Sequence, residues 1–362
     1  MTSKHNDDHS DVLRVAVLEG DGVGPEVVPV AMDVAKAALA AHGLTVDAVP
    51  LAYGATAIDS DGTPLPAATL DSLERFDLWV VGPHDNAAYP RELQMPPPGA
   101  VLRKQFGLYA NLRPAQALSG VAATSPDIDV LIVRENSEGF YADRNMTIGS
   151  GEFMPTPDIA MAVGVVTRAA SQRIAVEAFD AARRRRGHVT IVHKANVLAL
   201  TTGLFRDVCL EVAKDYPDVR VDTEHVDAMA ALLVRRPAEY DVIVTENLFG
   251  DILSDLAGEL SGSLGLAPSI NASHTQAMAQ AVHGAAPTIA GTGTANPVAM
   301  ILSVAMLLRW HGRRSGDARA EAAADAIDGA VAHVLADGTV TADLGGKAST
   351  RDFGAAVVAH LT

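Results

Sequence analysis

The sequence has one cysteine, far fewer basic than acidic residues, and no long hydrophobic run. A lone Cys209 excludes an internal disulfide and fits a reducing compartment, so we expect a cytoplasmic protein. The 28 Lys and Arg residues against 44 Asp and Glu give a net charge of −16, which argues against general binding to nucleic acid or anionic membranes. No apolar stretch reaches the roughly 18 residues of a membrane span, and the polar first eleven residues lack a signal segment. Such an acidic chain must gather cations locally if it binds an acidic small molecule.

What is present is an alternation of short apolar runs with helix-like segments, across 362 residues that are 48% hydrophobic. Residues 13–18 have the pattern of a buried strand, and an Ala/Val-rich helix is expected over 27–42. A second long helix is expected over 158–185. This alternation predicts an α/β protein, with helices covering both faces of a mostly parallel sheet. Gly20, Gly22 and Gly24 follow the first strand, but their spacing is not that of the Rossmann dinucleotide fingerprint.

Acidic residues cluster after the expected strand 241–245. Asp251 and Asp255 are four residues apart, which places them on one face of a helix expected from Gly250 onward. Ligands of open α/β sheets bind at the carboxyl ends of strands, and Asp227 stands on an earlier segment that could converge there. Three carboxylates favour Mg²⁺ or Mn²⁺. The spacing is also common in helices whose acidic residues complement the dipole, and a metal-dependent phosphatase is an alternative reading.

Basic residues stand at the ends of other segments. Arg103, Arg113 and Arg134 could form a socket for two carboxylates, because the guanidinium group pairs with carboxylates through two hydrogen bonds. Taken singly, each arginine is more often a surface cation. Lys194 follows the expected strand 189–192, where an unpaired ammonium group is costly to bury. Near an arginine cluster its pKa should fall, which would suit proton transfer, unless it is an ordinary surface lysine.

The segment 283–297 is rich in small residues and leads into an apolar helix expected over 297–308. This arrangement could place backbone N–H groups around a phosphate and leave His283 and Asn296 to hold a nucleotide. The alternative is a long surface loop, although loops of this length without a function are uncommon.

Six motifs occur in a fixed order: GDGVGPE, LRKQFGLYANLRP, VRENSEGFY, HKANVL, VDAMA with NLFGDILSD, and HGAAPTIAGTGTANP. Together they resemble the β-decarboxylating dehydrogenases of substituted malates, the family of 3-isopropylmalate, isocitrate, homoisocitrate and tartrate dehydrogenases. The resemblance covers about residues 15–308. It implies an isopropylmalate/isocitrate dehydrogenase-like two-domain α/β fold that is not a Rossmann fold. Its active site would lie in the interdomain cleft at a dimer interface.

The resemblance also implies domain boundaries. Residues 1–108 and 262–362 would form a larger, discontinuous cofactor-binding domain. Residues 109–261 would form a smaller domain that carries the metal ligands and the dimer interface.

By position in the motifs, the resemblance assigns binding of the substrate carboxylates to Arg103, Arg113 and Arg134. Lys194, contributed by the partner subunit of a homodimer, would assist removal of the hydroxyl proton. Tyr141 would protonate the enol carbon. These roles describe oxidative decarboxylation of a malate, with two carboxylates to hold and two protons to move.

Metal and cofactor residues follow from the same resemblance. Asp251 and Asp255 would bind Mg²⁺ or Mn²⁺ together with Asp227 from the partner subunit. A nicotinamide cofactor would contact residues of the last motif, namely His283, Gly284, Ala286, Pro287, Thr288, Ile289 and Asn296. In NAD-dependent members an acidic residue follows the HG-x-AP turn, and in NADP-dependent members a lysine and a tyrosine do. Here the pair is Thr288-Ile289, so NAD is favoured because the cations that recognise NADP are missing.

In this family, residues just before the first arginine of the second motif recognise the variable 3-substituent of the substrate. Isocitrate enzymes have a serine and an asparagine there and isopropylmalate enzymes have leucines, whereas this chain has Pro97, Gly99 and Ala100. No polar group is available for a third carboxylate, which disfavours isocitrate and homoisocitrate. We therefore predict NAD- and metal-dependent oxidative decarboxylation of a malate with an apolar 3-substituent, of which 3-isopropylmalate is the named example.

Three alternatives stay open. The first is a dehydrogenase of another 3-substituted malate or of tartrate in a specialised pathway. The second is an isocitrate or homoisocitrate dehydrogenase, if a cation from elsewhere such as His84 reaches the substrate. The third is a non-catalytic regulatory subunit, which is hard to reconcile with the presence of Lys194, Tyr141 and all three aspartates.

Overall fold

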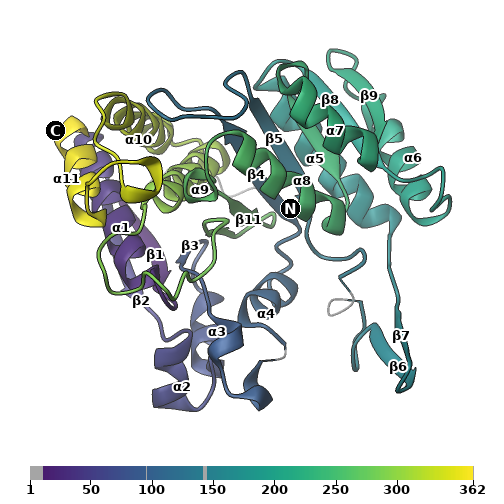
Figure 1. Ribbon diagram of the computed structural model, residues 1–362, viewed down its shortest axis with the longest axis horizontal. Helices are drawn as coiled ribbons and strands as arrows, with labels where there is room; N and C mark the ends of the chain where they lie inside the picture. Colours follow the sequence, from purple (N-terminus) through teal and green to yellow (C-terminus); the bar gives the residue numbers. More distant parts are fainter. Residues whose placement is uncertain (1–10, 95, 142–144, 362) are drawn as a thin grey trace, which may run out of the picture. The chain divides into compact units, whose positions relative to one another are not determined.

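The computed structural model describes residues 11–94, 96–141 and 145–361 (Figure 1). The chain forms two compact units, Met1–Asp85 with Ala277–Thr362, and Asn86–Gln276. Residues 86–108 and 262–276 thus belong to the second unit, whereas the sequence-based boundaries put them in the first domain. The functions assigned to the two domains stay predictions.

The first unit contains four parallel strands, in the order β2 (Thr45–Pro50), β1 (Val12–Leu18), β3 (Leu78–Val81) and β12 (Ala277–Ala279). Its helices are α1 (Gly24–Ala41), α2 (Ala55–Asp61), α3 (Ala67–Leu73), α9 (Val298–Ser315), α10 (Ala318–Ala336) and α11 (Thr350–Leu361). All four residues of β3 are buried, as expected for a parallel strand covered on both faces. α1 and α11 pack side by side (Figure 1).

The main sheet of the second unit has six strands, in the order β11 (Ile270–Ala272), β4 (Ala110–Gln116), β5 (Asp129–Glu135), β10 (Val242–Thr245), β8 (His188–His193) and β9 (Arg220–His225). The last four are parallel, and β4 is antiparallel to both of its neighbours. The helices are α4 (Pro98–Gln105), α5 (Arg168–Arg183), α6 (Thr201–Ala213), α7 (Val226–Arg235) and α8 (Asn247–Leu260). Because β5, β10 and β8 are parallel, the residues at their carboxyl ends meet at one edge of the sheet.

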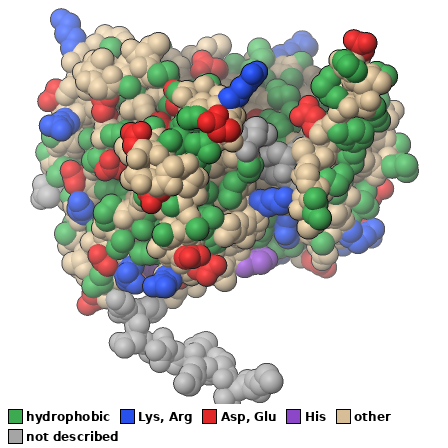
Figure 2. Space-filling view, turned by 90° about the horizontal axis from the view of Figure 1, so that it is seen from below, with side chains coloured by type: hydrophobic (Ala, Val, Ile, Leu, Met, Phe, Trp, Pro, Cys, Tyr) green, Lys and Arg blue, Asp and Glu red, His purple; other side chains and the backbone are tan. Residues whose placement is uncertain are grey.

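Single turns of 3₁₀ helix complete the two units, at Asn86–Ala88, Arg91–Leu93, Pro237–Glu239, Leu264–Leu266 and Ala342–Leu344. None of the helices in the described part of the chain is long and apolar enough to cross a membrane. On the face seen in Figure 2, basic and acidic side chains are interspersed among hydrophobic and neutral ones. The acidic start of the sequence, residues 1–10, lies outside the described residues.

The expectation of one helix over 158–185 is wrong. Residues 152–162 instead form a hairpin of β6 (Glu152–Thr156) and β7 (Ile159–Ala162), and α5 begins only at Arg168. Pro157 falls in the turn between the two strands. The side chain of Thr167 then accepts a hydrogen bond from the Ala170 N–H and caps α5. The hairpin extends away from the rest of its unit (Figure 1).

The start of α4 is rich in proline. The helix begins at Pro98, with Pro97 as its N-cap residue. Proline is well tolerated in the first turn, because its missing N–H has no intrahelical partner there. Met95 lies outside the described residues.

Candidate active site

The helix α8 carries two of the predicted metal ligands and begins directly after the buried strand β10. It starts at Asn247, three residues earlier than expected, because the Glu246 carboxylate caps it and accepts hydrogen bonds from the Leu248 and Phe249 N–H groups, each at 3.2 Å. Asp251 and Asp255 are consequently one turn apart on one face. Asp251 is the more enclosed, with 32% of its side chain exposed against 53% for Asp255.

Two of the predicted arginines reach the same helix face from neighbouring strands. Arg113 lies in β4 and Arg134 in β5, where residue 113 is opposite residue 132, so both side chains point to one face of the antiparallel pair. Arg113 Nη1 donates to Asp255 Oδ1 at 3.2 Å and lies 3.3 Å from Asp251 Oδ1. Arg134 Nη1 forms an ion pair with the same Asp251 oxygen. The fold therefore brings together two arginines and two aspartates that are far apart in sequence.

Tyr141 joins this group, which we call the Asp251 cluster: Arg113, Arg134, Tyr141, Asp251 and Asp255. The Tyr141 hydroxyl donates to Asp251 Oδ2, and the Arg134 guanidinium lies 5.6 Å from the centre of the Tyr141 ring. Both carboxylate oxygens of Asp251 therefore accept hydrogen bonds from residues of the cluster.

The pKa values of Asp251 and Asp255 are shifted in opposite directions. Burial acts to raise the pKa of Asp251, but the charge of Arg134, the Tyr141 hydrogen bond and the charges of Arg113 and Arg103 outweigh it and lower that pKa. Arg103, on α4, thereby contributes to the electrostatics of the cluster. Burial raises the pKa of Asp255, and Arg113 only partly offsets this effect.

Further residues that the sequence reasoning missed hold the arginines in place. Asn247 Oδ1 accepts from Arg134 Nε at 3.1 Å and from Nη2 at 2.7 Å. Ser254 Oγ accepts from Arg113 Nη1 at 2.8 Å. A Cβ atom on Gly250 would lie 2.6 Å from Arg134 Cγ, so only glycine permits this approach. The one signal in the sequence was the position of Asn247, a polar residue between a buried strand and a helix.

Lys194 and Asp227 form a separate pair in the same unit. Lys194 follows β8 and Asp227 lies in the first turn of α7, which follows the neighbouring strand β9. Lys194 Nζ lies 2.6 Å from Asp227 Oδ1, and this hydrogen bond lowers the pKa of Asp227. Among the described residues, neither side chain has a hydrogen bond or ion pair to the Asp251 cluster. The expected arginine neighbours of Lys194 are therefore not found within one chain.

The predicted cofactor segment lies in the first unit, between β12 and α9. Its backbone packs against the start of α1, where the Val23 N–H donates to Ala285 O at 2.9 Å, and a Cβ atom on Gly22 would come within 1.9 Å of that oxygen. Thr288 and Ile289 are exposed at its tip, and Gly284 and Pro287 are exposed beside them. The segment is thus held at its base and open at its tip.

Individual residues of this segment have distinct environments. Burial lowers the pKa of His283, whose Nδ1 lies 3.0 Å from Gly284 O. Ala286 has a φ of 43°, an unusual conformation for a residue with a side chain. Asn296 Nδ2 donates to Asp343 Oδ2 at 3.0 Å, and its Oδ1 accepts from the Val298 N–H at the start of α9.

Comparison with known proteins assigns the chain to a family, since the model for isocitrate/isopropylmalate dehydrogenase matches residues 14–357. The chain belongs to the isocitrate/isopropylmalate dehydrogenase family. It is 43% identical over 352 residues to the isocitrate/homoisocitrate dehydrogenase of Thermus thermophilus, covering 96% of this chain and 98% of the relative. It is 39% identical over 342 residues to the 3-isopropylmalate dehydrogenase of Saccharolobus solfataricus, covering 94% of this chain and 97% of the relative.

A solved structure, the isocitrate dehydrogenase of Methylococcus capsulatus, has 40% sequence identity and a TM-score of 0.85, covering 96% of this chain and 99% of that one. The predicted non-Rossmann α/β fold of the isopropylmalate/isocitrate dehydrogenase type is thereby confirmed. As a member of the isocitrate/isopropylmalate dehydrogenase family, the chain is an enzyme, a decarboxylating hydroxy-acid dehydrogenase. The role of each site residue stays a prediction.

The donor groups of this dehydrogenase suit a hard divalent cation in kind, since carboxylate oxygens are the ligands that Mg²⁺ and Mn²⁺ prefer. The lowered pKa of Asp251 keeps that group ionised at neutral pH. Within the described residues, however, no three potential ligands gather at one point. A metal site that used Asp251 and Asp255 would therefore need a further ligand from outside this group.

Proposed function

We propose that the enzyme catalyses the NAD-dependent and divalent-metal-dependent oxidative decarboxylation of a malate with an apolar 3-substituent, of which 3-isopropylmalate is the named example. The Asp251 cluster carries this proposal. It combines cations for the substrate carboxylates, carboxylates for a metal ion and a phenol for proton transfer around one aspartate.

The arginines supply the binding of the substrate carboxylates. Arg113 and Arg134 point to one face and are positioned by Ser254 and Asn247, and Arg103 acts on the same aspartate through its charge. A malate presents two carboxylates, and guanidinium groups bind each of them with defined geometry.

The proton-transfer groups complete the reaction. Hydride leaves C2 of the malate as the hydroxyl loses its proton, and we assign assistance of this loss to Lys194. The carboxylate on C3 then leaves as CO₂, and Tyr141 donates a proton to C3 of the resulting enol. When bound, the nicotinamide accepts the hydride, and the divalent ion polarises the oxygen on C2. The hydrogen bond to Asp251 positions the Tyr141 hydroxyl, which we assign as the donor of the proton to C3.

A homodimer with shared sites explains why Lys194 and Asp227 lie apart from the Asp251 cluster. Apolar side chains that a monomer would leave in water support this association: Ile252 on α8 is 57% exposed and Val234 on α7 is 55% exposed. The β6–β7 hairpin adds Met154 at 62% and Ile159 at 51%. A second copy would cover these surfaces and contribute its own lysine and aspartate.

The surroundings of α4 support an apolar 3-substituent. Gly99 and Ala100 are buried there, and a cavity of about 500 Å³ lies beside the helix. The cavity is lined by Pro96, Ala100, Val101, Lys104, Gln105, Gly149 and Ser150. Among the described residues that line it, the one charged group is the Lys104 ammonium, which donates to the Met146 carbonyl at 3.0 Å. The volume also favours a second candidate within the same chemistry, a malate whose 3-substituent is larger than isopropyl.

The exposed tip of the cofactor segment supports NAD over NADP. Neither Thr288 nor Ile289 carries a charge, so no cation at this tip would recognise the additional phosphate of NADP. The bent, glycine-containing backbone of this segment could bind the pyrophosphate of either cofactor.

A spectrophotometric assay of reduced nicotinamide tests the proposal. The enzyme with Mg²⁺ or Mn²⁺ is given 3-isopropylmalate, 3-methylmalate, 3-benzylmalate, tartrate, isocitrate and homoisocitrate, each with NAD and with NADP. We expect turnover of the alkyl- or aryl-substituted malates with NAD and release of CO₂. Preferential turnover of isocitrate or homoisocitrate would overturn the substrate assignment, and no turnover of any substrate would favour a regulatory subunit.

A further inference from the structure

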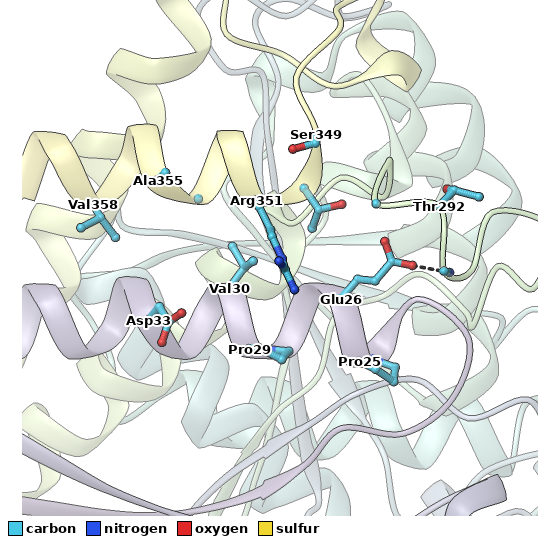
Figure 3. Close-up of a pocket in the computed structure, with 14 residues that line it drawn as sticks. Pro25, Glu26, Pro29, Val30, Asp33, Thr292, Ser349, Arg351, Ala355 and Val358 are labelled. Atoms are coloured by element: carbon cyan, nitrogen blue, oxygen red, sulfur yellow. Dashed lines mark hydrogen bonds between the residues drawn. The ribbon is translucent and has the colours of Figure 1, made fainter.

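The first unit contains a cavity of about 1050 Å³ that none of the predicted substrate, metal or cofactor residues lines. It lies between the first half of α1, the start of α11 and the turn 291–293 (Figure 3). The two helices approach closely at Gly354, where a Cβ atom would lie 2.3 Å from Val30 Cγ1. The cavity opens where they separate.

A cation reaches into this cavity from α11. The Arg351 side chain extends from the first turn of α11 across Val30 toward α1 (Figure 3). It forms no hydrogen bond or ion pair with any residue in the described part of the chain. Arg351 is an exposed residue, and its guanidinium group is available to an anionic ligand.

A carboxylate lines the same cavity from α1. Glu26 Oε1 accepts a hydrogen bond from the Gly291 N–H at 2.5 Å (Figure 3). Glu26 Oε2 is buried and has no hydrogen-bond partner among the described residues. A buried carboxylate oxygen without a partner is unfavourable, because it loses its hydration and gains nothing in exchange. Glu26 therefore lines the cavity with a carboxylate whose one hydrogen bond among the described residues comes from the Gly291 N–H.

We propose that this cavity binds a free α-amino acid with an apolar side chain. Its carboxylate would pair with Arg351, and its ammonium group would pair with the carboxylate groups of Glu26 and Asp33 on the α1 wall. The apolar side chain would lie against Pro29, Val30 and Val358, which line the cavity between the two charged groups.

Charge selects this ligand class over a nucleotide. The described residues that line the cavity include one cation, Arg351, and two carboxylates, Glu26 and Asp33. A neutral zwitterion adds no net charge to this set. A phosphate dianion would face both carboxylates in a chain whose net charge is already −16.

The proposed site is linked to the cofactor segment through both of its walls. Glu26 holds Gly291, as described above. Thr350, next to Arg351, donates from its N–H to Gly293 O at 2.9 Å and from its hydroxyl to Ala295 O at 2.7 Å. A ligand that bridges Glu26 and Arg351 would therefore stabilise the turn between Ile289 and Asn296, and the amino acid and any ligand of that segment would affect each other's affinity.

Calorimetry of the full chain with L-valine, L-leucine, L-methionine and L-phenylalanine tests the site without reference to catalysis. We expect saturable binding of at least one of them. Leucinamide, which lacks the carboxylate, and 4-methylpentanoate, which lacks the ammonium group, should each bind about tenfold more weakly or worse. Absence of saturable binding for all four amino acids would overturn the proposal.

Matched variants locate the binding. Arg351→Gln should weaken binding about tenfold or more, and Ala355→Phe should block the cavity from its exposed rim. Lys347→Gln, which removes an exposed charge outside the cavity, should leave binding unchanged. Binding that survives both Arg351→Gln and Ala355→Phe would refute the location. If AMP binds and these two variants abolish its binding, the cavity is a nucleotide site and the zwitterion assignment is wrong.

Hydrogen exchange provides a second readout. The amino acid should slow exchange of the backbone amides in residues 291–295 and leave β9, in the other unit, unchanged. Slower exchange at neither 291–295 nor the start of α11 would contradict the proposed link to the cofactor segment.

Discussion

The Asp251 cluster and the Lys194–Asp227 pair contain the same kinds of charged groups but differ in how complete they are. Both oxygens of Asp251 are engaged, by two arginines and a tyrosine, and 32% of its side chain is exposed. Asp227 has one side-chain partner and is 68% exposed. The first group is assembled by contacts within one chain, whereas the second is open to a further component. This difference is the physical basis for proposing that two chains share each active site.

The largest expected effect comes from the centre of the assembled group. Asp251→Asn removes a charge that we assign to metal binding and one of the two carboxylate oxygens that accept from Arg134 and Tyr141, so kcat should fall by about 10³-fold. The thermal unfolding temperature should also fall, because the buried Arg134 side chain loses its charged partner, so circular dichroism must show that the variant is folded at the assay temperature. Asp59→Asn, which neutralises an exposed aspartate on α2, is the matched control. Wild-type turnover in Asp251→Asn would refute the assignment of this residue as a metal ligand.

The buried carboxyl group of Glu246 should make the free energy of unfolding depend on pH. Burial raises the pKa of Glu246 from 4.5 to about 7, although the Phe249 and Leu248 N–H groups and Arg134 act against it. Because the folded-state pKa of Glu246 is raised, the contribution of the protonated group to the free energy of unfolding is complete below pH 4.5. It is lost as the pH rises through about 7. The loss is on the order of 3 kcal/mol, since one pKa unit corresponds to about 1.4 kcal/mol.

Denaturant unfolding of Glu246→Gln between pH 5 and pH 8 measures this effect. The wild-type protein should lose stability relative to the variant as the pH increases. Glu74→Gln, at an exposed position, should follow the wild type throughout. Parallel pH profiles for wild type and Glu246→Gln would mean that Glu246 does not titrate in this range.

A smaller effect is expected at the cavity beside α4. Ala100→Leu should fill part of that cavity and reduce kcat/KM for 3-benzylmalate relative to 3-methylmalate by about tenfold, as other methylene-sized changes in apolar pockets do. Ala359→Leu, on the exposed side of α11, should not alter the ratio. An unchanged ratio in Ala100→Leu would place the 3-substituent elsewhere.

The smallest effect concerns the cofactor segment, which is exposed at its tip like the Lys194–Asp227 pair. Thr288→Asp should lower the KM for NAD by about threefold, since a carboxylate there could accept hydrogen bonds from ribose hydroxyls. Thr275→Asp adds the same charge at an exposed position in the other unit and should have no effect. If the KM is the same in Thr288→Asp, the adenosine ribose does not lie near residue 288.

Sequence reasoning succeeded where a local pattern determines the structure. The apolar run of β10 and the spacing of Asp251 and Asp255 predicted a strand followed by a helix with both carboxylates on one face. It failed where contacts between distant segments decide. Asn247 matters because β5 brings Arg134 against the start of α8, and no spacing rule reveals this.

The hairpin β6–β7 and the ion pair of Lys194 also depend on pairings between segments that the local sequence does not reveal. The segment 158–185 contains enough helix-forming residues to suggest one helix, but its first part pairs as a strand with residues before it. Within one chain the parallel register of β8 with β9 places Asp227 beside Lys194, a pairing that no spacing in the sequence indicates. Registers and pairings of this kind depend on the whole sheet.

Mixed dimers test the central claim most directly. Asp251→Asn and Lys194→Ala variants, each nearly inactive alone, are unfolded together, refolded as a mixture and assayed. If each site combines the Asp251 cluster of one chain with Lys194 of the other, a mixed dimer contains one site with both defects and one intact site. We expect turnover to reappear on mixing, in proportion to the mixed dimers formed. No recovery, with mixed dimers demonstrated by mass spectrometry, would show that Lys194 does not act in the partner's site and would contradict the account.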